Sequence, residues 1–170
     1  NPTEMLVYTQ TSPQVRNIAK KITDIKSLNF YGEPVKVTID QTNGFTWPWT
    51  WYLRNDENTS FPQLTDVSDL SNTDSDILLI HSTNRMSADM TLPEEFSEGI
   101  PYPHRWWFPE DAYRHISLAD YISGDSSLVA GLKYWFSRSG VADKIGSEEG
   151  VLYYRQSLEN SERLVEDLKY

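Results

Sequence analysis

The sequence predicts an α/β fold: a mostly parallel sheet with helices on both faces, in a three-layer, Rossmann-like arrangement. Short apolar runs of strand length alternate with stretches of helical periodicity, and turn-forming residues separate them. No repeat, low-complexity tract or linker divides the 170 residues, so residues 1–170 are expected to form a single soluble domain. The G-x-G-x-x-G fingerprint of dinucleotide-binding Rossmann domains is absent.

The first third of the chain predicts a strand, a helix and a second strand. Met5 to Tyr8 is a short apolar run, typical of a strand buried on both faces. Ser12 and Pro13 follow as an N-cap and a first helical residue, and the helix is expected to reach about Leu28. Alternating apolar residues from Val35 to Ile39 predict the second strand. Together these elements predict a βαβ unit with a right-handed crossover.

The middle of the chain is less regular. The segment Trp47 to Arg54 is expected to be a short helix, because Pro48 lies near its start and disfavours a strand. Ile77 to Ile80 predicts another buried strand. From Met86 to Pro109 the sequence is rich in proline and predicts irregular structure, with a strand at Arg105 to Phe108.

The last third predicts two helices, a strand and a terminal helix. Pro109 and two acidic residues after it are typical of a helix start. Apolar residues from Leu128 to Phe136 recur at helical spacing. Val151 to Tyr154 predicts a strand, and the chain from Ser157 onward predicts a helix.

Composition excludes several classes of function. The formal net charge of −10 repels a phosphate backbone, so no nucleic-acid partner is expected. There is no cysteine, which excludes disulfides and thiolate chemistry. No apolar run is long enough to span a bilayer. Because the chain opens with Asn1 rather than Met, we expect it to be part of a longer protein whose membrane segments lie upstream.

Polar residues follow the predicted strands at the sheet edge where open α/β domains bind ligands. They form a weaker candidate site, a polar crevice of Thr9, Thr11, Ser12, Asp40 and His81. Asp40 and His81 would make an acid/base pair if they met in space. The alternative is that these residues only cap helices and form turns.

No cofactor, metal or catalytic residue is predicted in this chain. The three histidines lack the H-E-x-x-H spacing of zinc sites, and no P-loop is present. The triplet Asp74-Ser75-Asp76 matches the D-x-D pattern of some sugar transferases, but it precedes a predicted strand instead of following one.

Two aromatic strings are the most informative feature. They form the main binding hypothesis: Trp47, Trp49, Trp51, Tyr52 and Arg54 in the first string, and His104, Arg105, Trp106 and Trp107 in the second. Tryptophan faces pack on sugar rings and lipid chains, and arginine binds phosphates and carboxylates. The alternative is that the tryptophans fill the core, each burying roughly 200 Å². Both interpretations stay open.

The same strings carry a resemblance. The segments Trp47-Pro48 to Trp51-Tyr52-Leu53-Arg54 and His104-Arg105-Trp106-Trp107-Phe108-Pro109 resemble the C-terminal extracytoplasmic region of prokaryotic flippase-activity-associated proteins. These are multi-spanning membrane glycosyltransferases similar to protein mannosyltransferases. The opening Leu6 to Pro13 and the late Gly150 to Arg155 are also similar to that region.

The resemblance implies a cell-membrane parent that handles a sugar carried on a polyprenyl phosphate in protein glycosylation. This domain would lie on the extracytoplasmic side, with the membrane half of the same polypeptide as its partner and the lipid-linked sugar as a possible ligand. The catalytic acid is expected in the membrane half, so the domain would be an accessory, noncatalytic in isolation. Two alternatives remain: a carbohydrate- or ligand-binding module without an enzymatic parent, and a self-contained α/β enzyme that uses Asp40 and His81.

Overall fold

The computed structural model describes residues 9–28, 33–64, 70–107 and 146–158. The chain divides into two compact units. Unit 1 takes Asn1–Ser12 and Arg105–Glu148, and unit 2 takes Pro13–His104 and Glu149–Tyr170. The expected strand at 5–8, the helices expected between 109 and 140 and the body of the terminal helix lie outside the described residues.

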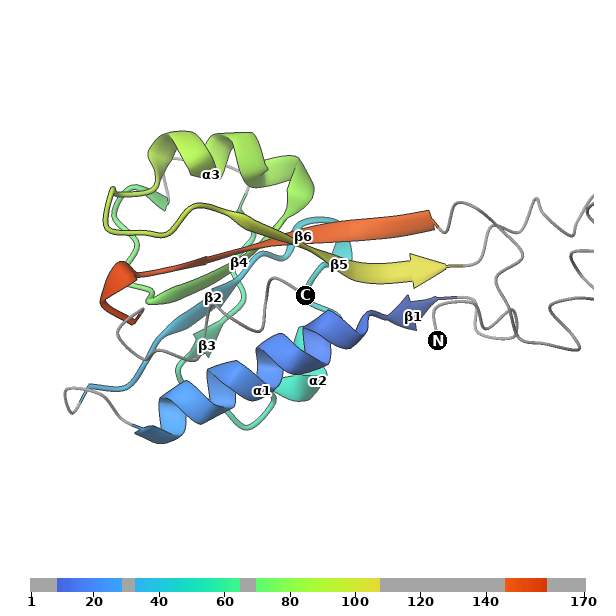
Figure 1. Ribbon diagram of the computed structural model, residues 1–170, viewed down its shortest axis with the longest axis horizontal. Coiled ribbons are helices and arrows are strands. Elements are labelled where there is room, and N and C mark those ends of the chain that lie inside the picture. Colours follow the sequence, from blue (N-terminus) through green and yellow to red (C-terminus); the bar gives the residue numbers. More distant parts are fainter. Residues whose placement is uncertain (1–8, 29–32, 65–69, 108–145, 159–170) are drawn as a thin grey trace, which may run out of the picture. The chain divides into compact units, whose positions relative to one another are not determined.

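Six strands form one sheet in the order β1-β5-β6-β4-β2-β3 (Figure 1). Their bounds are Gln10–Thr11 (β1), Val37–Ile39 (β2), Thr59–Ser60 (β3), Ile77–His81 (β4), Ile100–Trp107 (β5) and Gly146–Tyr154 (β6). The α-helices are Pro13–Leu28 (α1), Trp49–Tyr52 (α2) and Arg85–Thr91 (α3). Three 3₁₀ turns span Thr42–Gly44 (η2), Ser82–Asn84 (η4) and Gln156–Leu158 (η5).

The predicted fold class is wrong, because the sheet is mixed and the described ranges contain few helices. β2 runs parallel to β3 and β4, but β4 pairs antiparallel with β6 and β1 pairs antiparallel with β5. β1 is not a neighbour of β2 in this sheet, and the first strand of the predicted βαβ unit, at 5–8, lies outside the described residues. Periodicity locates buried strands along a chain, but it carries no information on strand direction.

Unit 2 has two buried clusters, one on each face of its strands. Alternate residues of β4 point to opposite faces, so Ile77 and Leu79 join the first cluster, while Leu78 and Ile80 join the second. α1 and α2 supply apolar side chains to the first cluster, and α3 supplies Ala88 to the second. Figure 1 shows α1 and α3 on opposite sides of β4.

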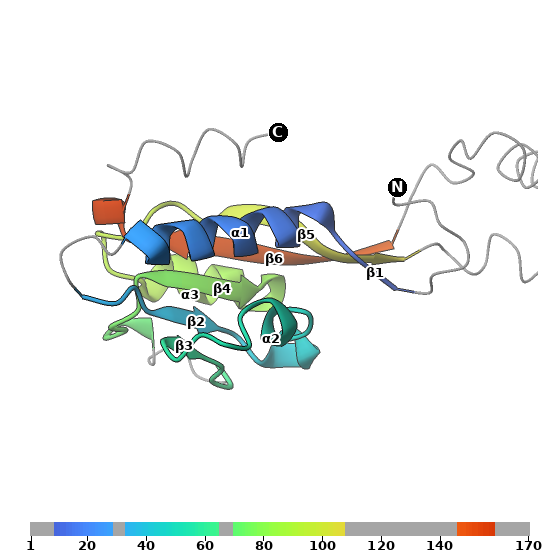
Figure 2. The same ribbon diagram turned by 90° about the horizontal axis from the view of Figure 1, so that it is seen from below.

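Helix α1 forms where the sequence predicts it. The Ser12-Pro13 start is in place, and the helix ends at Leu28. One face of the helix is buried, namely Val15, Ile18, Ala19, Ile22 and Ile25. α2 spans Trp49–Tyr52, which confirms that the Trp47 to Arg54 segment contains a helix rather than a strand. α2 contacts α1, and Figure 2 shows α2 beyond the end of β2.

The prediction of irregular structure from Met86 to Pro109 is wrong in two places. α3 covers Arg85–Thr91, and β5 begins at Ile100 instead of Arg105. Prolines at 101 and 103 lie within β5, a strand in which buried and partly exposed residues alternate, with Tyr102 and His104 buried. Proline lowers the strand propensity of a segment, but this alternation and the burial on one face override it.

Candidate functional site

A group of exposed aromatic side chains lies at and around α2. Trp47 is 56% exposed, Trp51 57% and Tyr52 37%. The guanidinium carbon of Arg54 lies 4.5 Å from the ring centroid of Trp51, within cation–π range. Arg54 also donates a 2.7 Å hydrogen bond from Nη1 to the Trp51 carbonyl, which fixes the stacked position. We call these four residues the α2 aromatic surface.

The spacing of the tryptophans explains why some are exposed and one is buried. On a helix, residues two apart point in different directions. Trp49 points inward and is fully buried, whereas Trp51 points outward. Phe45, Trp49 and Leu53 are buried at spacing four and join the first cluster of unit 2.

His104 connects the second aromatic string to the first. Its Nε2 donates a 2.9 Å hydrogen bond to the Trp47 carbonyl, because a carbonyl oxygen only accepts. The His104 ring stacks on Trp49 with centroids 5.9 Å apart, and it lies 4.1 Å from the centroid of Phe45. His104 is fully buried. It therefore supports the α2 segment from inside the core instead of lying on the α2 aromatic surface.

The rest of the second string belongs to unit 1. Arg105 donates a 2.6 Å hydrogen bond from Nε to Glu148 Oε2, so its charge is neutralised locally. Trp106 is half-buried and pairs with Gln10 of β1, and Trp107 is 37% exposed. Within unit 1, the indole of Trp107 lies over Gly146, where any Cβ would overlap it. Phe108 lies outside the described residues.

Asp40 is a buried hydrogen-bond acceptor at the end of β2. Its Oδ1 accepts from the Thr42 main-chain N–H at 2.9 Å. Its Oδ2 accepts from the His81 main-chain N–H at 3.1 Å and from Asn84 Nδ2 at 2.8 Å. We call Asp40, Thr42, His81 and Asn84 the Asp40 cluster. Because Asp40 is fully buried and both oxygens are engaged, it ties the ends of β2 and β4 together.

His81 meets Asp40, but through its backbone. The imidazole Nδ1 accepts a 3.2 Å hydrogen bond from the Thr83 main-chain N–H, so the proton of the neutral ring is on Nε2. Thr83 Oγ1 lies 2.7 Å from the same Nδ1. The hydrogen bond from the Thr83 main-chain N–H makes His81 the N-cap of η4. The geometry of Asp40 and His81 is thus that of a structural turn.

The remaining residues of the predicted polar crevice lie in unit 1. Thr9 and Thr11 are exposed, and Thr11 pairs with Arg105 of β5. Ser12 is buried at the start of α1, the place of an N-cap. Thr9, Thr11 and Ser12 therefore belong to unit 1, whereas Asp40 and His81 belong to unit 2.

The Asp74-Ser75-Asp76 triplet is part of a structural network. Asp76 Oδ2 accepts from the Lys36 main-chain N–H at 2.9 Å, and Asp74 forms an ion pair with the Lys36 ammonium group at 2.6 Å. Ser75 lies 2.5 Å from Thr38, oxygen to oxygen. Within the described ranges, no group of three or more histidine, aspartate or glutamate side chains could hold a metal ion.

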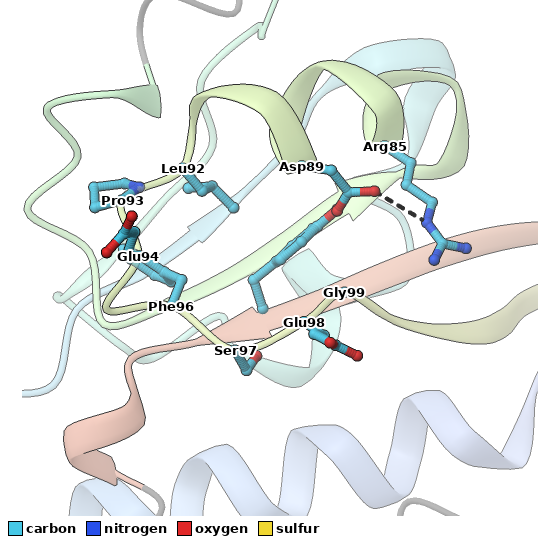
Figure 3. A pocket seen from close by; sticks show the side chains of 10 residues that line it. Arg85, Asp89, Leu92, Pro93, Glu94, Phe96, Ser97, Glu98 and Gly99 are labelled. Atoms are coloured by element: carbon cyan, nitrogen blue, oxygen red, sulfur yellow. Dashed lines mark hydrogen bonds and ion pairs between the residues drawn. The ribbon is translucent and has the colours of Figure 1, made fainter.

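A cavity of about 430 Å³ lies between α3, the segment from Leu92 to Gly99 and β6 (Figure 3). Its lining residues are Arg85, Asp89, Leu92, Pro93, Glu94, Phe96, Ser97, Glu98, Gly99 and Tyr153. We call it the Asp89 pocket. It was missed from the sequence because the segment that builds it was predicted to be irregular. The sequence offered one signal for α3, which carries part of the lining: Arg85 and Asp89 are spaced four residues apart, as in an ion pair on a helix.

The tyrosine of this pocket is held as a neutral phenol. Tyr153 is buried, and its hydroxyl donates a 2.7 Å hydrogen bond to Asp89 Oδ1. Burial, together with the hydrogen bond to this carboxylate and its negative charge, raises the pKa of Tyr153 well above its ordinary value. Tyr153 is therefore a hydrogen-bond donor at all physiological pH values.

Comparisons with models of protein families, with curated proteins and with solved structures find no match to this chain. In the described part of the chain, no helix has both the length and the apolar character that crossing a membrane requires.

Proposed function

We propose that this chain is a noncatalytic accessory domain of a membrane glycosyltransferase that uses a lipid-linked sugar, and that the α2 aromatic surface contacts the sugar. The observation that carries the proposal is the exposure of Trp47, Trp51 and Tyr52 within six residues, beside the stacked Arg54. Large aromatic side chains gathered at a surface are typical of binding sites. The resemblance of the two aromatic strings to flippase-activity-associated proteins supports the choice of ligand.

The chemistry of this surface suits a sugar attached to a phosphate. Indole faces pack against the C–H faces of sugar rings, and the phenol of Tyr52 can hydrogen-bond a sugar hydroxyl. Arg54 has one guanidinium nitrogen bonded to the Trp51 carbonyl, and a guanidinium carries five N–H donors in all. The others can engage a phosphate oxygen. Trp49 and His104 are buried beneath the segment and hold it in place.

The test is an NMR titration of the 170-residue chain with a short-chain prenyl-phosphate mannose and, separately, with mannobiose. We expect the indole N–H signals of Trp47 and Trp51 to shift on saturation. Trp51→Ala should weaken binding, whereas Met90→Ala, which removes an 80% exposed side chain elsewhere, should not. Saturation that leaves both indole signals unchanged, or equal weakening by the two variants, would refute the sugar-contact assignment.

The noncatalytic part of the proposal has its own test. The chain is incubated with the same prenyl-phosphate mannose and a peptide acceptor, and mannosyl transfer is followed by mass spectrometry. We expect none, because the acid required for transfer is assigned to the membrane half of the parent protein. Transfer by the isolated chain would show that it is an enzyme in its own right.

A further inference from the structure

The Asp89 pocket is lined by apolar and acidic side chains together. Its apolar lining is Leu92, Pro93 and Phe96. Phe96 belongs to the second cluster of unit 2, and the partly buried Leu92 packs against that cluster. A cavity of about 430 Å³ lies in the size range of small-molecule sites.

The lining of the cavity carries more negative than positive charge. Three carboxylates, those of Asp89, Glu94 and Glu98, line the cavity with a single guanidinium, that of Arg85 (Figure 3). Among the described residues, Arg85 forms its ion pair with Asp89, at 3.5 Å. Glu94 and Glu98 are exposed, and neither side chain forms a hydrogen bond or an ion pair with another described residue. The cavity therefore favours a cation over an anion.

Tyr153 fixes the position of the Asp89 carboxylate. The buried phenol donates to Oδ1, and because its pKa is raised it keeps this proton. Gly99 faces the Tyr153 ring so closely that a Cβ there would lie 2.8 Å from it. The ring is thus clamped between Gly99 and Asp89, and the carboxylate that it holds is a preorganised acceptor.

The arrangement distinguishes an organic cation from a metal ion. A metal ion needs several ligands that converge on one point, and the described carboxylates do not converge in this way. In Figure 3, Glu94 lies beside Pro93 and Phe96, whereas Glu98 lies apart from them. An extended ligand can therefore place an ammonium group at either of these carboxylates and its carbon chain against Leu92 and Phe96. We propose that the Asp89 pocket binds a small alkylammonium ligand, an amine carried on a short aliphatic chain such as a diamine. This site shares no residue with the α2 aromatic surface.

The experiment compares two probes of equal length, cadaverine and 1,5-pentanediol, which differ in charge. Binding to the 170-residue chain is followed by calorimetry and by the backbone amide signal of Gly99, which lines the cavity. We expect cadaverine to bind and to shift the Gly99 signal, and the diol to do neither. Equal binding of the diol, or no binding of cadaverine at millimolar concentration, would overturn the proposal.

Charge-removing variants test whether the cavity itself is responsible. Glu94→Gln with Glu98→Gln keeps the shapes and should weaken cadaverine binding roughly 3- to 20-fold, because each exposed carboxylate contributes up to a few-fold. Asp89→Asn keeps an acceptor for Tyr153 and should weaken binding further. The control, Glu33→Gln with Glu57→Gln, removes the same charge from exposed residues outside the cavity. Weakening of equal size in this control would show a general field effect and refute the site.

Discussion

Asn84 Nδ2 donates a 2.8 Å hydrogen bond to the buried carboxylate of Asp40, which joins the turn after β4 to the end of β2. The same amide lies 3.0 Å from Thr42 Oγ1 and 3.4 Å from the Leu64 carbonyl. Asn84 therefore fixes two loops to the carboxylate at once.

Replacing Asp40 by asparagine should destabilise the fold strongly. One oxygen becomes an NH₂ group that faces an N–H donor, so at least one buried hydrogen bond is lost, at a cost of about 2–4 kcal/mol. Urea unfolding followed by circular dichroism measures this loss. Asp24→Asn, an exposed change on α1, should stay within about 0.5 kcal/mol. A stable Asp40→Asn protein would show that the Asp40 cluster does not hold β2 and β4 together.

Two tryptophans of α2, two residues apart, should respond oppositely to alanine. Trp49 is fully buried, so Trp49→Ala should cost about 3–5 kcal/mol. Trp51 is mostly exposed, so Trp51→Ala should change the free energy of unfolding by less than about 1 kcal/mol. Thermal unfolding of the two variants side by side measures the difference. If Trp51→Ala proved the more damaging, the orientation of α2 would be wrong.

Stability should fall at alkaline pH because of Tyr153. Its pKa is raised above the ordinary value of 10.0 in the folded state, so above about pH 10 the unfolded chain loses this proton while the folded chain keeps it. The stability that the raised pKa of Tyr153 contributes is fully present below pH 10. It is lost as the pH rises toward the pKa of Tyr153 in the folded state. Tyr153→Phe should lower stability at pH 8 by about 1 kcal/mol, and its decline from pH 9 to pH 11 should be shallower than that of the wild type. Parallel curves for the two proteins would contradict this assignment.

Two glycines should be sensitive to alanine for different reasons. A Cβ at Gly150 would lie 2.5 Å from the Tyr102 ring and 2.7 Å from Phe45, so Gly150→Ala should cost about 1–3 kcal/mol through overpacking. Gly44 has open space around it but a φ of +72°, so Gly44→Ala should cost about 1–2 kcal/mol through backbone strain. Phe45→Leu should partly rescue the first variant and not the second. Thermal midpoints of the single and double variants provide the measurement, and equal rescue of both would exclude the steric explanation.

Local patterns in the sequence predicted what is local in the structure. α1 was predicted correctly because its first proline and its apolar stripe lie within the helix, and Ser12 directly precedes it. β2, β4 and the last part of β6 coincide with apolar runs, since both faces of these strands are buried. The strand directions could not be predicted, because antiparallel pairing of β4 with β6 joins segments about 70 residues apart.

The candidate site was predicted only in part. The aromatic string from Trp47 to Arg54 was recognised, but its division into a buried Trp49 and an exposed Trp51 depends on where the core lies. The Asp89 pocket was not predicted, because Tyr153 reads from the sequence as an ordinary buried strand residue. Its hydrogen bond to Asp89 depends on the tertiary structure, because α3 places Asp89 beside the phenol although the two residues are 64 positions apart in the sequence.

Phe45 touches both buried imidazoles of unit 2, with ring centroids 5.7 Å from His81 and 4.1 Å from His104. The turn after β4 and the middle of β5 therefore share one wall, and displacement of this ring disturbs both. Substitutions of the two histidines should accordingly be thermodynamically coupled, so that the double variant is not the sum of the single ones. We therefore expect one phenyl ring to couple two parts of unit 2. These are the strand ends joined by the Asp40 cluster and the segment beneath the α2 aromatic surface.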